Sequence, residues 1–313
     1  MLEIVEKLAG LSPRQFEREA MTRKYIIKVL NKSGVGFRLQ NFNVTVPEYT
    51  DYYLKADGKN IECMPTCFVS GKIDESFDLI SSLDYSYESK GRSNINYNPY
   101  CDSISLANYY NSPAIAISRK DAKRIKKAKN IEGFVKVVKI KCISCNILAG
   151  KLKNPDNIFF AHYDGFFAGV LDNASGVAVC MSTILSSKEV LKNNLFVFCG
   201  SEELSFDKPD YWGKCFRVFE NRNRDVLMRA GKIIIVDCVG SGTPEMVTDD
   251  KIVPLYFPAK SLGRIMNKTF VVTSAEKKPL ELMSVYHSKL DTLKNVRKND
   301  LEKAEKLCLK LCK

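Results

Sequence analysis

Asn157-Ile-Phe-Phe-Ala-His162-Tyr163-Asp164 is the stretch of sequence that decides the fold. Four apolar residues in a row are too few for a helix and are typical of a strand that is buried on both faces. A histidine and an aspartate follow this run immediately. The same arrangement recurs three times: LFVFC at 195–199 precedes Glu202 and Glu203, KIIIV at 232–236 precedes Asp237, and LMSVY at 282–286 precedes His287.

Helical patterns lie before and between these apolar runs. Residues 12–34, 173–187 and 298–312 each carry apolar side chains near helical spacing, and residues 37–46 alternate as a strand does. Buried strands that alternate with helices predict an α/β fold with a mostly parallel central sheet, flanked by helices. In such a sheet the residues that follow the strands gather at one edge, where ligands bind.

The residues expected at that edge are those of a metal site. The chain has only two histidines, and both follow apolar runs, as do several carboxylates. Taken singly, each residue has an ordinary explanation; Asp172, for example, precedes a helix and could be an N-cap. Taken together, imidazole and carboxylate groups at one edge predict a site for two divalent metal ions. The candidate residues are His162, Asp172, Glu202, Glu203, Asp237 and His287.

Residues 49–140 differ in composition from the rest of the chain. They are rich in Tyr, Asn, Ser and Asp, with short possible strands and a basic helix near 119–128. We predict that residues 1–48 and 141–313 form the catalytic domain. Residues 49–140 would then be a small, β-rich domain inserted into it.

Composition limits the partners. The formal net charge is +12, but the lysines are dispersed apart from one run at 119–129, which we interpret as the solvent face of a helix. We therefore expect no nucleic-acid partner.

No apolar run approaches the length of a membrane span, and the N-terminus lacks a secretory signal, so we expect a cytoplasmic protein without a membrane partner. The 11 cysteines are expected to be reduced and mostly buried, and a homo-oligomer is left open.

Five motifs together resemble the dizinc exopeptidase family, which includes aminopeptidase Y, bacterial leucine aminopeptidases, glutamate carboxypeptidase and glutaminyl cyclase. They are AHYD at 161–164, GVLDNASGVA at 169–178, GSEE at 200–203, VD at 236–237 and YHSKLDT at 286–292. The motifs cover about residues 145–313 in the family's order. The resemblance implies the family's three-layer fold, and residues 49–140 look like a reduced form of its protease-associated domain.

The resemblance also implies a role for each residue of the site. His162 and Asp237 would bind one zinc ion, Glu203 and His287 the other, and Asp172 would bridge them. Glu202 would be the general base, and Asp164 would orient His162. Relatives have a cis peptide bond where this chain has Asp172-Asn173. Zinc is the expected metal, although cobalt or manganese could substitute.

The resemblance favours an aminopeptidase that acts on short peptides by attack of a metal-bridging water. A carboxypeptidase is an alternative, with Arg217, Arg222 or Arg224 as the carboxylate partner. A glutaminyl cyclase-like enzyme is a second alternative, and a non-catalytic binding protein on the same scaffold is a third. The chain departs from its relatives in two places. Only nine residues separate His162 from Asp172, and the loop after Glu203, which contains the single tryptophan, Trp212, is unlike theirs.

Overall fold

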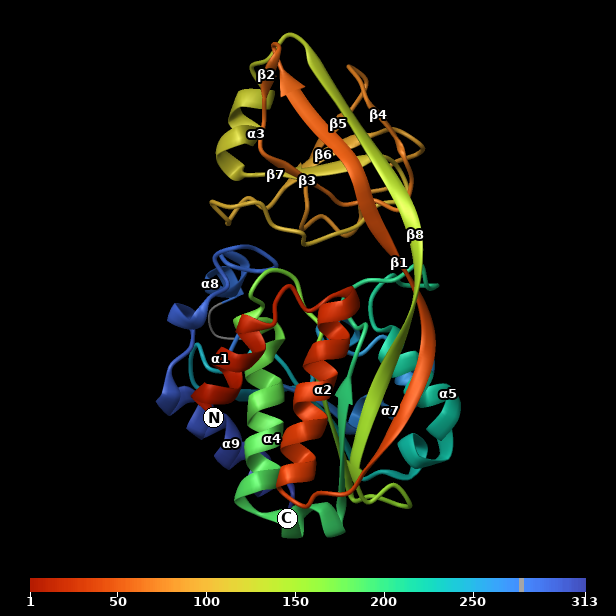
Figure 1. Cartoon of the computed structure of the whole chain (residues 1–313), viewed down its shortest axis with the longest axis vertical. Helices are drawn as coiled ribbons and strands as arrows, with labels where there is room; N and C mark the ends of the chain where they lie inside the picture. The colour runs from red at the N-terminus through yellow and green to blue at the C-terminus, as the bar shows by residue number, and fades with distance from the viewer. Residues whose placement is uncertain (276–278) are drawn as a thin grey trace. The chain divides into compact units, whose positions relative to one another are not determined.

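A computed structural model describes residues 1–275 and 279–313 (Figure 1). The chain divides into two compact units. The first consists of Met1–Val44, Cys142–Pro279 and Asp291–Lys313, and the second of Thr45–Lys141 and Leu280–Leu290. The second unit thus contains the segment that was predicted to be an insertion. It also contains a segment near the C-terminus that the sequence had assigned to the catalytic domain.

Four parallel strands form the centre of the first unit's sheet, in the order β13-β11-β9-β10. They are β9 (Asn157–His162), β10 (Asn194–Cys199), β11 (Lys232–Val236) and β13 (Thr269–Thr273). Every residue of β9 and β10 is buried, as expected for parallel strands that are covered on both faces. The apolar runs at 157–161, 195–199 and 232–236 are therefore strands, as predicted.

The prediction of a strand at residues 282–286 is wrong. Pro279–Met283 forms helix α8, and a turn follows it. An apolar run of this length does not distinguish a strand from a helix, and a proline at the first position favours a helix. The fourth parallel strand is instead β13, with the sequence TFVVT, which the sequence analysis did not identify. His287 therefore follows no strand of this sheet.

Antiparallel strands extend the sheet on both sides. On one side β12 (Glu245–Val247) pairs with β13. On the other, β8 (Ile131–Gly150) pairs with β10 and is followed by β1 (Phe37–Ala56) and β2 (Lys59–Asn60), while β4 (Gly71–Ile73) also pairs with β8. The strand predicted at 37–46 is the first half of β1. The division between the two units falls within the long strands β1 and β8.

Aromatic side chains of β9 pack on both faces of the sheet. Phe160 packs edge-on against Phe216 and Phe219 of helix α5 (Lys214–Arg229), with ring centroids 5.5 and 5.1 Å apart. Phe159 points to the opposite face, because successive side chains alternate along a strand, and it stacks on Phe196 at 4.7 Å.

The other helices surround this sheet. Helix α4 (Gly176–Ser186) packs against β9 and against the C-terminal helix α9 (Lys298–Leu311). The predicted helix at 12–34 begins only at Phe16, because Arg14 instead pairs with Gly165 in an isolated β-bridge. The remaining helical segments of the first unit are α1 (Leu2–Gly10), α2 (Phe16–Lys32), Val170–Ser175, Lys188–Lys192, α6 (Val253–Tyr256), α7 (Leu262–Ile265), Met266–Lys268 and Leu293–Asn295.

The second unit has its own sheet and its own core. Its strands are β3 (Cys63–Pro65), β7 (Ala114–Ile117), β6 (Asn94–Tyr97) and β5 (Asp78–Ser81), in the order β3-β7-β6-β5. Helix α3 (Arg119–Ile125) follows β7. Ile95, Ile115 and Ile117 of the sheet form a buried apolar cluster with Ala122 and Ile125 of α3. This unit therefore has an apolar core separate from that of the parallel sheet.

Two further properties concern the whole chain. Among the residues described, none of the helices combines the length and the apolar character that a membrane crossing requires. All 11 cysteines are free thiols, and most of them are buried, as expected from the sequence.

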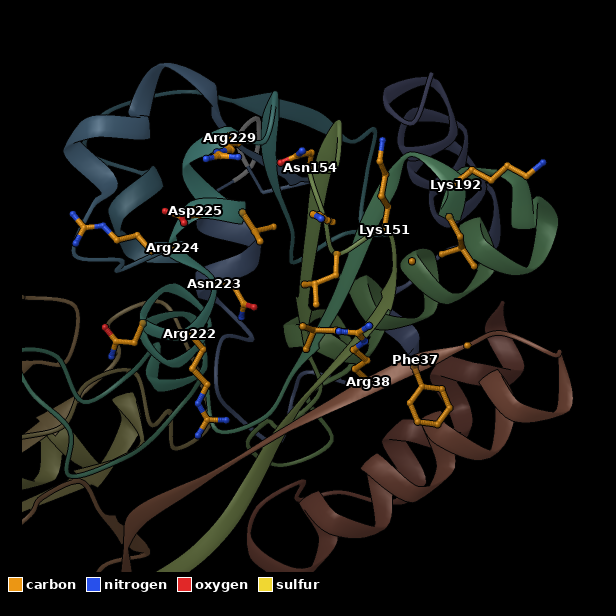
Figure 2. A pocket seen from close by; sticks show the side chains of 18 residues that line it. Phe37, Arg38, Lys151, Asn154, Lys192, Arg222, Asn223, Arg224, Asp225 and Arg229 are labelled. Atoms are coloured by element: carbon orange, nitrogen blue, oxygen red, sulfur yellow. The ribbon is translucent and has the colours of Figure 1, made fainter.

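A groove of about 1310 Å³ lies at the edge of the sheet where the parallel strands begin (Figure 2). Residues 36–38, 148, 150–154, 191–192, 221–226 and 229 line it, and all of them belong to the first unit. Seven of the 18 lining residues are Lys or Arg, so we call it the basic groove.

Candidate metal centre

The opposite edge of the sheet, where the parallel strands end, gathers the candidate metal ligands of the first unit. His162 is the last residue of β9, and Asp237 directly follows β11. Glu202 and Glu203 lie in the loop after β10, and Asp172 lies in the turn before α4. All five side chains are buried. The residues that follow these parallel strands therefore lie at one edge of the sheet, which is where ligands bind in folds of this kind.

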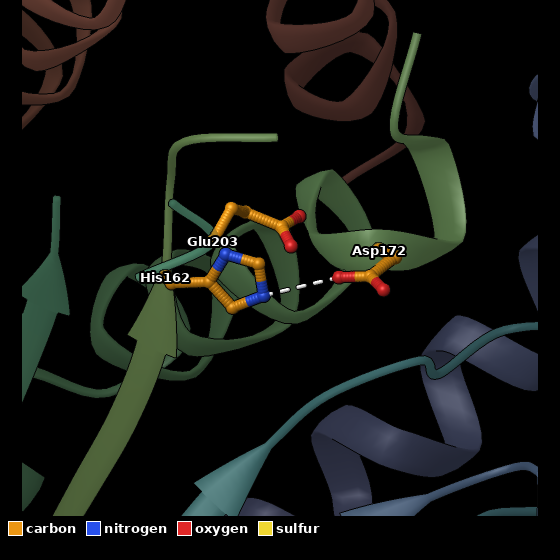
Figure 3. A group of neighbouring side chains, drawn as sticks. All are labelled: His162, Asp172 and Glu203. Atoms are coloured by element: carbon orange, nitrogen blue, oxygen red, sulfur yellow. Dashed lines mark ion pairs between the residues drawn. The ribbon is translucent and has the colours of Figure 1, made fainter. Parts of the chain in front are cut away.

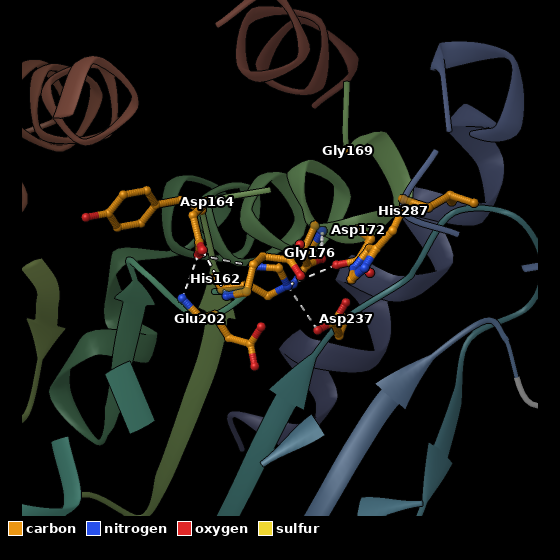
Figure 4. Close-up of polar contacts among 12 residues, drawn as sticks. His162, Asp164, Gly169, Asp172, Gly176, Glu202, Asp237 and His287 are labelled. Atoms are coloured by element: carbon orange, nitrogen blue, oxygen red, sulfur yellow. Dashed lines mark hydrogen bonds and ion pairs between the residues drawn. The ribbon is translucent and has the colours of Figure 1, made fainter. Parts of the chain in front are cut away.

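The imidazole of His162 is the centre of this cluster. Its Nε2 atom lies 3.1 Å from Asp172 Oδ1 and 3.3 Å from Asp237 Oδ2 (Figure 4). Potential ligand atoms of His162, Asp172 and Glu203 all lie within 4.8 Å of one another (Figure 3). One imidazole nitrogen and several carboxylate oxygens at such separations match the donor set of a zinc site.

Asp172 belongs to two possible ligand groups. Besides the group with His162 and Glu203, its carboxylate lies within 4.8 Å of ligand atoms of Asp237 and Cys238. Cys238 was interpreted from the sequence only as a buried apolar residue. Burial, together with the nearby carboxylates of Asp172 and Asp237, raises the pKa of its thiol well above the usual value, which disfavours the thiolate form needed for metal binding.

The N-cap explanation of Asp172 does not apply. Helix α4 begins after Ser175, and no side chain caps it at that position. The amide of Asn173 instead accepts the N–H of Gly176 at 3.0 Å and donates to the carbonyl of Val236 at 2.9 Å. The Asp172-Asn173 peptide bond is cis, as the resemblance implied.

Asp164 organises the pair of glutamates. Its two carboxylate oxygens accept the backbone N–H groups of Glu202 at 3.0 Å and Glu203 at 2.9 Å. One of the same oxygens, Oδ1, lies 3.5 Å from His162 Nδ1. This single buried carboxylate thus links the histidine at the end of β9 to the loop after β10, and Figure 4 shows it between them.

The site contains more buried negative charge than its own cations can balance. Burial, reinforced by Glu203 and Asp164, raises the pKa of Glu202 well above its usual value. Burial by itself would lower the pKa of His162, but Asp237, Asp164 and Asp172 outweigh it and raise that pKa well above 6.5. Buried carboxylates are costly without positive partners, so this donor set fits divalent cations.

Arg14 is a residue of the site that the sequence analysis missed. Its side chain is fully buried, and it donates to the carbonyls of Tyr163 at 2.8 Å, Ala168 at 2.7 Å and Gly169 at 2.8 Å. These carbonyls lie in the nine-residue connection between His162 and Asp172. A single guanidinium therefore fixes the loop that separates these two candidate ligands. The only feature of the sequence that could have pointed to Arg14 was its position beside Pro13, and that position is far from every motif.

Gly169 is required by this arrangement. It has a φ of +50°, which favours glycine. A Cβ atom there would lie 2.6 Å from the carbonyl oxygen of Asp172 and 2.8 Å from Arg14 Nη2. The glycine of the GVLD motif thus allows the Arg14 guanidinium and the Asp172 backbone to approach each other.

Asp291 is a second residue to which the sequence analysis gave no role. Its carboxylate accepts the backbone N–H of Leu171 at 2.9 Å and of Asp172 at 3.2 Å. Burial raises its pKa to about 7. These contacts give a structural role to Asp291, the aspartate four residues after His287. It holds the backbone of Asp172, a proposed ligand, and is not itself proposed to bind metal.

His287 belongs to the second unit and contacts residues of that unit. Its Nδ1 atom lies 3.2 Å from the carbonyl oxygen of Leu106, and the Leu106 N–H donates to the His287 carbonyl at 2.9 Å. The hydroxyl of Ser105 donates to the Tyr286 carbonyl at 2.7 Å and accepts the Asn98 amide at 3.2 Å. Segment 280–290 is thus fixed to residues near 105, a connection that no local pattern predicts.

The residues proposed for a carboxypeptidase do not form one cationic cluster. Arg217 is buried and donates to Asp207 at 3.0 Å, so its charge is balanced. Arg222 and Arg224 line the basic groove at the other edge of the sheet. The ring of Trp212 contacts that of Tyr211 with centroids 4.9 Å apart.

Solved structures with the same fold are known. A zinc aminopeptidase from Bacillus subtilis matches with a TM-score of 0.71 and 15% identity, over 98% of this chain and 92% of that one. An aminopeptidase from Aneurinibacillus sp. strain AM-1 matches with a TM-score of 0.62 and 16% identity, over 97% and 91%. A glutaminyl cyclase from Porphyromonas gingivalis matches with a TM-score of 0.53 and 12% identity, over 99% and 95%.

Sequence comparison adds no relative, since neither a family model nor a curated protein matches the chain. The structural matches nevertheless include zinc aminopeptidases and glutaminyl cyclases, members of the group that the five motifs resemble. The chain therefore has the α/β fold of the zinc exopeptidases, with a mostly parallel central sheet and flanking helices.

Proposed function

We propose that this protein is a zinc-dependent aminopeptidase that removes N-terminal residues from short peptides. One observation carries the proposal: His162, Asp172, Glu203 and Asp237 converge in a buried cluster beside Glu202 where the parallel strands end. The fold supports it, because a zinc aminopeptidase from Bacillus subtilis has the same fold. Imidazole and carboxylate ligands suit zinc, although cobalt or manganese could replace it.

Two metal ions would divide these ligands. His162 and Asp237 would hold one ion, Glu203 and His287 the other, and Asp172 would bridge them. The membership of Asp172 in two ligand groups supports the bridging role. A hydrogen bond from His287 Nδ1 to the carbonyl of Leu106 would leave the lone pair on Nε2 for a metal ion.

The ions would contribute Lewis acidity and lower the pKa of a water molecule. The protein's own contribution is proton transfer and orientation. Glu202 would accept the proton of the attacking water and pass it to the amine of the leaving peptide. Its carboxylate is buried, and Asp164 fixes its backbone N–H, so the base is held in place before substrate arrives. Glu203, fixed by the same carboxylate, would remain a ligand.

Peptide turnover tests the proposal directly. Short peptides with a free or an acetylated N-terminus are incubated with the protein, in the presence of added zinc or of a chelator. Cleavage that requires the free amine and the metal is expected. Equal cleavage of the acetylated peptides would exclude an aminopeptidase and favour a carboxypeptidase or a deacylase. Metal binding without any turnover would favour a non-catalytic role.

A glutaminyl cyclase-like activity is the second candidate, because glutaminyl cyclases also share the fold. Peptides with an N-terminal glutamine distinguish the two. A cyclase closes the terminal residue into a ring and releases ammonia without cleaving a peptide bond. An aminopeptidase releases free glutamine. Mass spectrometry of the products separates these outcomes.

A further inference from the structure

The basic groove gathers charge in the first unit that the proposed function does not use. Its seven Lys and Arg residues and its single acid, Asp225, leave an excess of six positive charges. This is half of the chain's formal net charge of +12. Figure 2 shows Arg38, Lys151 and Arg229, which come from three different parts of the chain. Bringing like charges together is unfavourable unless an anion balances them.

Few of these cations are balanced by the protein itself. Within the described part of the chain, Lys151 lies 3.7 Å from Asp156 and Lys192 pairs with Glu189. These pairs are on the surface and contribute little energy. No ion pair within the described ranges 1–275 and 279–313 involves Arg38 or Arg229, and both side chains are exposed.

The groove and the candidate metal centre lie at opposite edges of the sheet. Residues before β9, β10 and β11 line the groove, whereas the ligands lie at or beyond the ends of these strands. A strand of six residues, such as β9, is about 20 Å long. The groove is therefore a separate site from the metal centre.

The size and the lining identify the kind of ligand. The volume of about 1310 Å³ exceeds the ~1,000 Å³ upper range of small-molecule pockets, so an extended ligand fits better. Five apolar side chains contribute to the lining, and Phe37 is the only aromatic one. Single-stranded nucleic acid binds on several stacked aromatic rings, and this groove has only one. An inorganic polyphosphate chain has no apolar group that could pack against the other four apolar side chains.

We propose that the basic groove binds an acidic peptide segment in which apolar residues alternate with aspartate or glutamate. Arginine forks pair with carboxylates through two parallel hydrogen bonds, and the amides of Asn154 and Asn223 can bond to a peptide backbone. The half-buried Leu152 and Val226 would contact the apolar side chains. The proposal does not depend on the proposed peptidase activity.

Binding of a fluorescein-labelled peptide to the full chain, measured by fluorescence anisotropy, tests the proposal. The probe alternates glutamate and leucine and is N-acetylated, so that it is not an aminopeptidase substrate. We expect saturable binding that weakens as salt is added and is unchanged by a chelator. No binding of this probe overturns the proposal, as does binding that disappears with the metal.

A matched pair of variants locates the site. The groove variant replaces Arg38, Lys151 and Arg229 by serine, which removes three positive charges from the groove. The control variant replaces Lys120, Lys123 and Lys127 by serine, which removes three exposed positive charges from the region of α3. We expect about tenfold weaker binding for the groove variant only. Equal weakening in both variants would show general charge attraction and overturn the proposal. Unchanged Trp212 fluorescence and thermal unfolding verify that each variant is folded.

Other polyanions test the ligand class. Single-stranded oligonucleotide, inorganic polyphosphate and a peptide containing only glutamate compete with the labelled probe. We expect the alternating peptide to compete best. Tighter competition by the oligonucleotide or by polyphosphate would overturn the peptide assignment in favour of a phosphate polymer. Equal competition by the glutamate peptide would overturn the role of the apolar lining.

Discussion

Replacing Arg14 by methionine should destabilise the first unit and loosen its candidate metal centre. The substitution keeps a long apolar stem but removes donors to the carbonyls of Tyr163, Ala168 and Gly169, at 2.7–2.8 Å. A hydrogen bond to a charged group contributes about 1.5–3 kcal/mol, so three of them contribute at most about 9 kcal/mol. The loss is smaller than this sum, because the Ala168 carbonyl still accepts the Ser12 hydroxyl at 2.9 Å and the Gly169 carbonyl still accepts the Ala174 N–H at 3.1 Å. Part of this loss of stability is offset, because water can enter and bond to the carbonyls and because a buried charge is removed. We expect a net loss of about 2–5 kcal/mol.

Urea unfolding followed by the fluorescence of Trp212 measures this loss, since the only tryptophan lies in the first unit. Metal titration of the chelator-treated protein shows whether the connection between His162 and Asp172 has loosened, and we expect weaker binding. Arg18→Met is the matched control, because Arg18 is exposed and donates to the Ser12 carbonyl.

Arg14→Lys separates charge from geometry. Lysine keeps the positive charge but lacks the planar fork that reaches several carbonyls at once, so we expect an intermediate loss. Our reasoning would be refuted if Arg14→Met unfolded at the same urea concentration as Arg18→Met and bound metal as tightly as the unmodified chain. In that case the loop would be held by other contacts.

Three further predictions concern the base, the pH dependence and the His287 segment. Glu202→Gln should retain bound metal but lose most of its peptidase turnover; unchanged turnover would exclude Glu202 as the base. Because burial raises the pKa of Asp291 from 3.8 to about 7, the metal-free fold binds a proton that the unfolded chain has lost. Its stability should therefore fall by about 3 kcal/mol as the pH rises from 4 to 7, and Asp291→Asn should remove that contribution in urea unfolding at the two pH values. Ser105→Ala removes the hydroxyl that donates to the Tyr286 carbonyl and should weaken one of two metal sites about tenfold in a titration, whereas His287→Ala should abolish that site. Two equally tight sites in either variant would contradict the proposed role of His287.

The parts of the fold that the sequence predicted are those with a local signal. The runs NIFFA, LFVFC and KIIIV are apolar throughout, and such runs form strands when both faces of a sheet are covered. The strand TFVVT was missed because its two threonines weaken the apolar signal. The run at 282–286 was wrongly predicted because four or five apolar residues fit a strand or a helix equally well.

The proximity of the candidate ligands in the first unit was also predictable. Parallel strands end at a common edge, so the residues that follow three of them had to lie near one another, and they do. The supporting residues were not predictable in the same way. In the sequence, Arg14 and Asp291 are far from the candidate ligands that they support. They act through backbone carbonyl and N–H groups, which carry no sequence signature.

The sequence by itself determined the α/β class, three of the four central strands and a cluster of possible metal ligands, because these follow from local periodicity and from the rule for strand ends. Only the tertiary structure showed that Asp164 holds both glutamates, that one guanidinium fixes the connection between two ligands, and that seven cations share a groove. It also decided that the His287 segment packs with residues near 105. Such pairings depend on contacts between distant parts of the chain, and their energies arise only when the whole fold has formed.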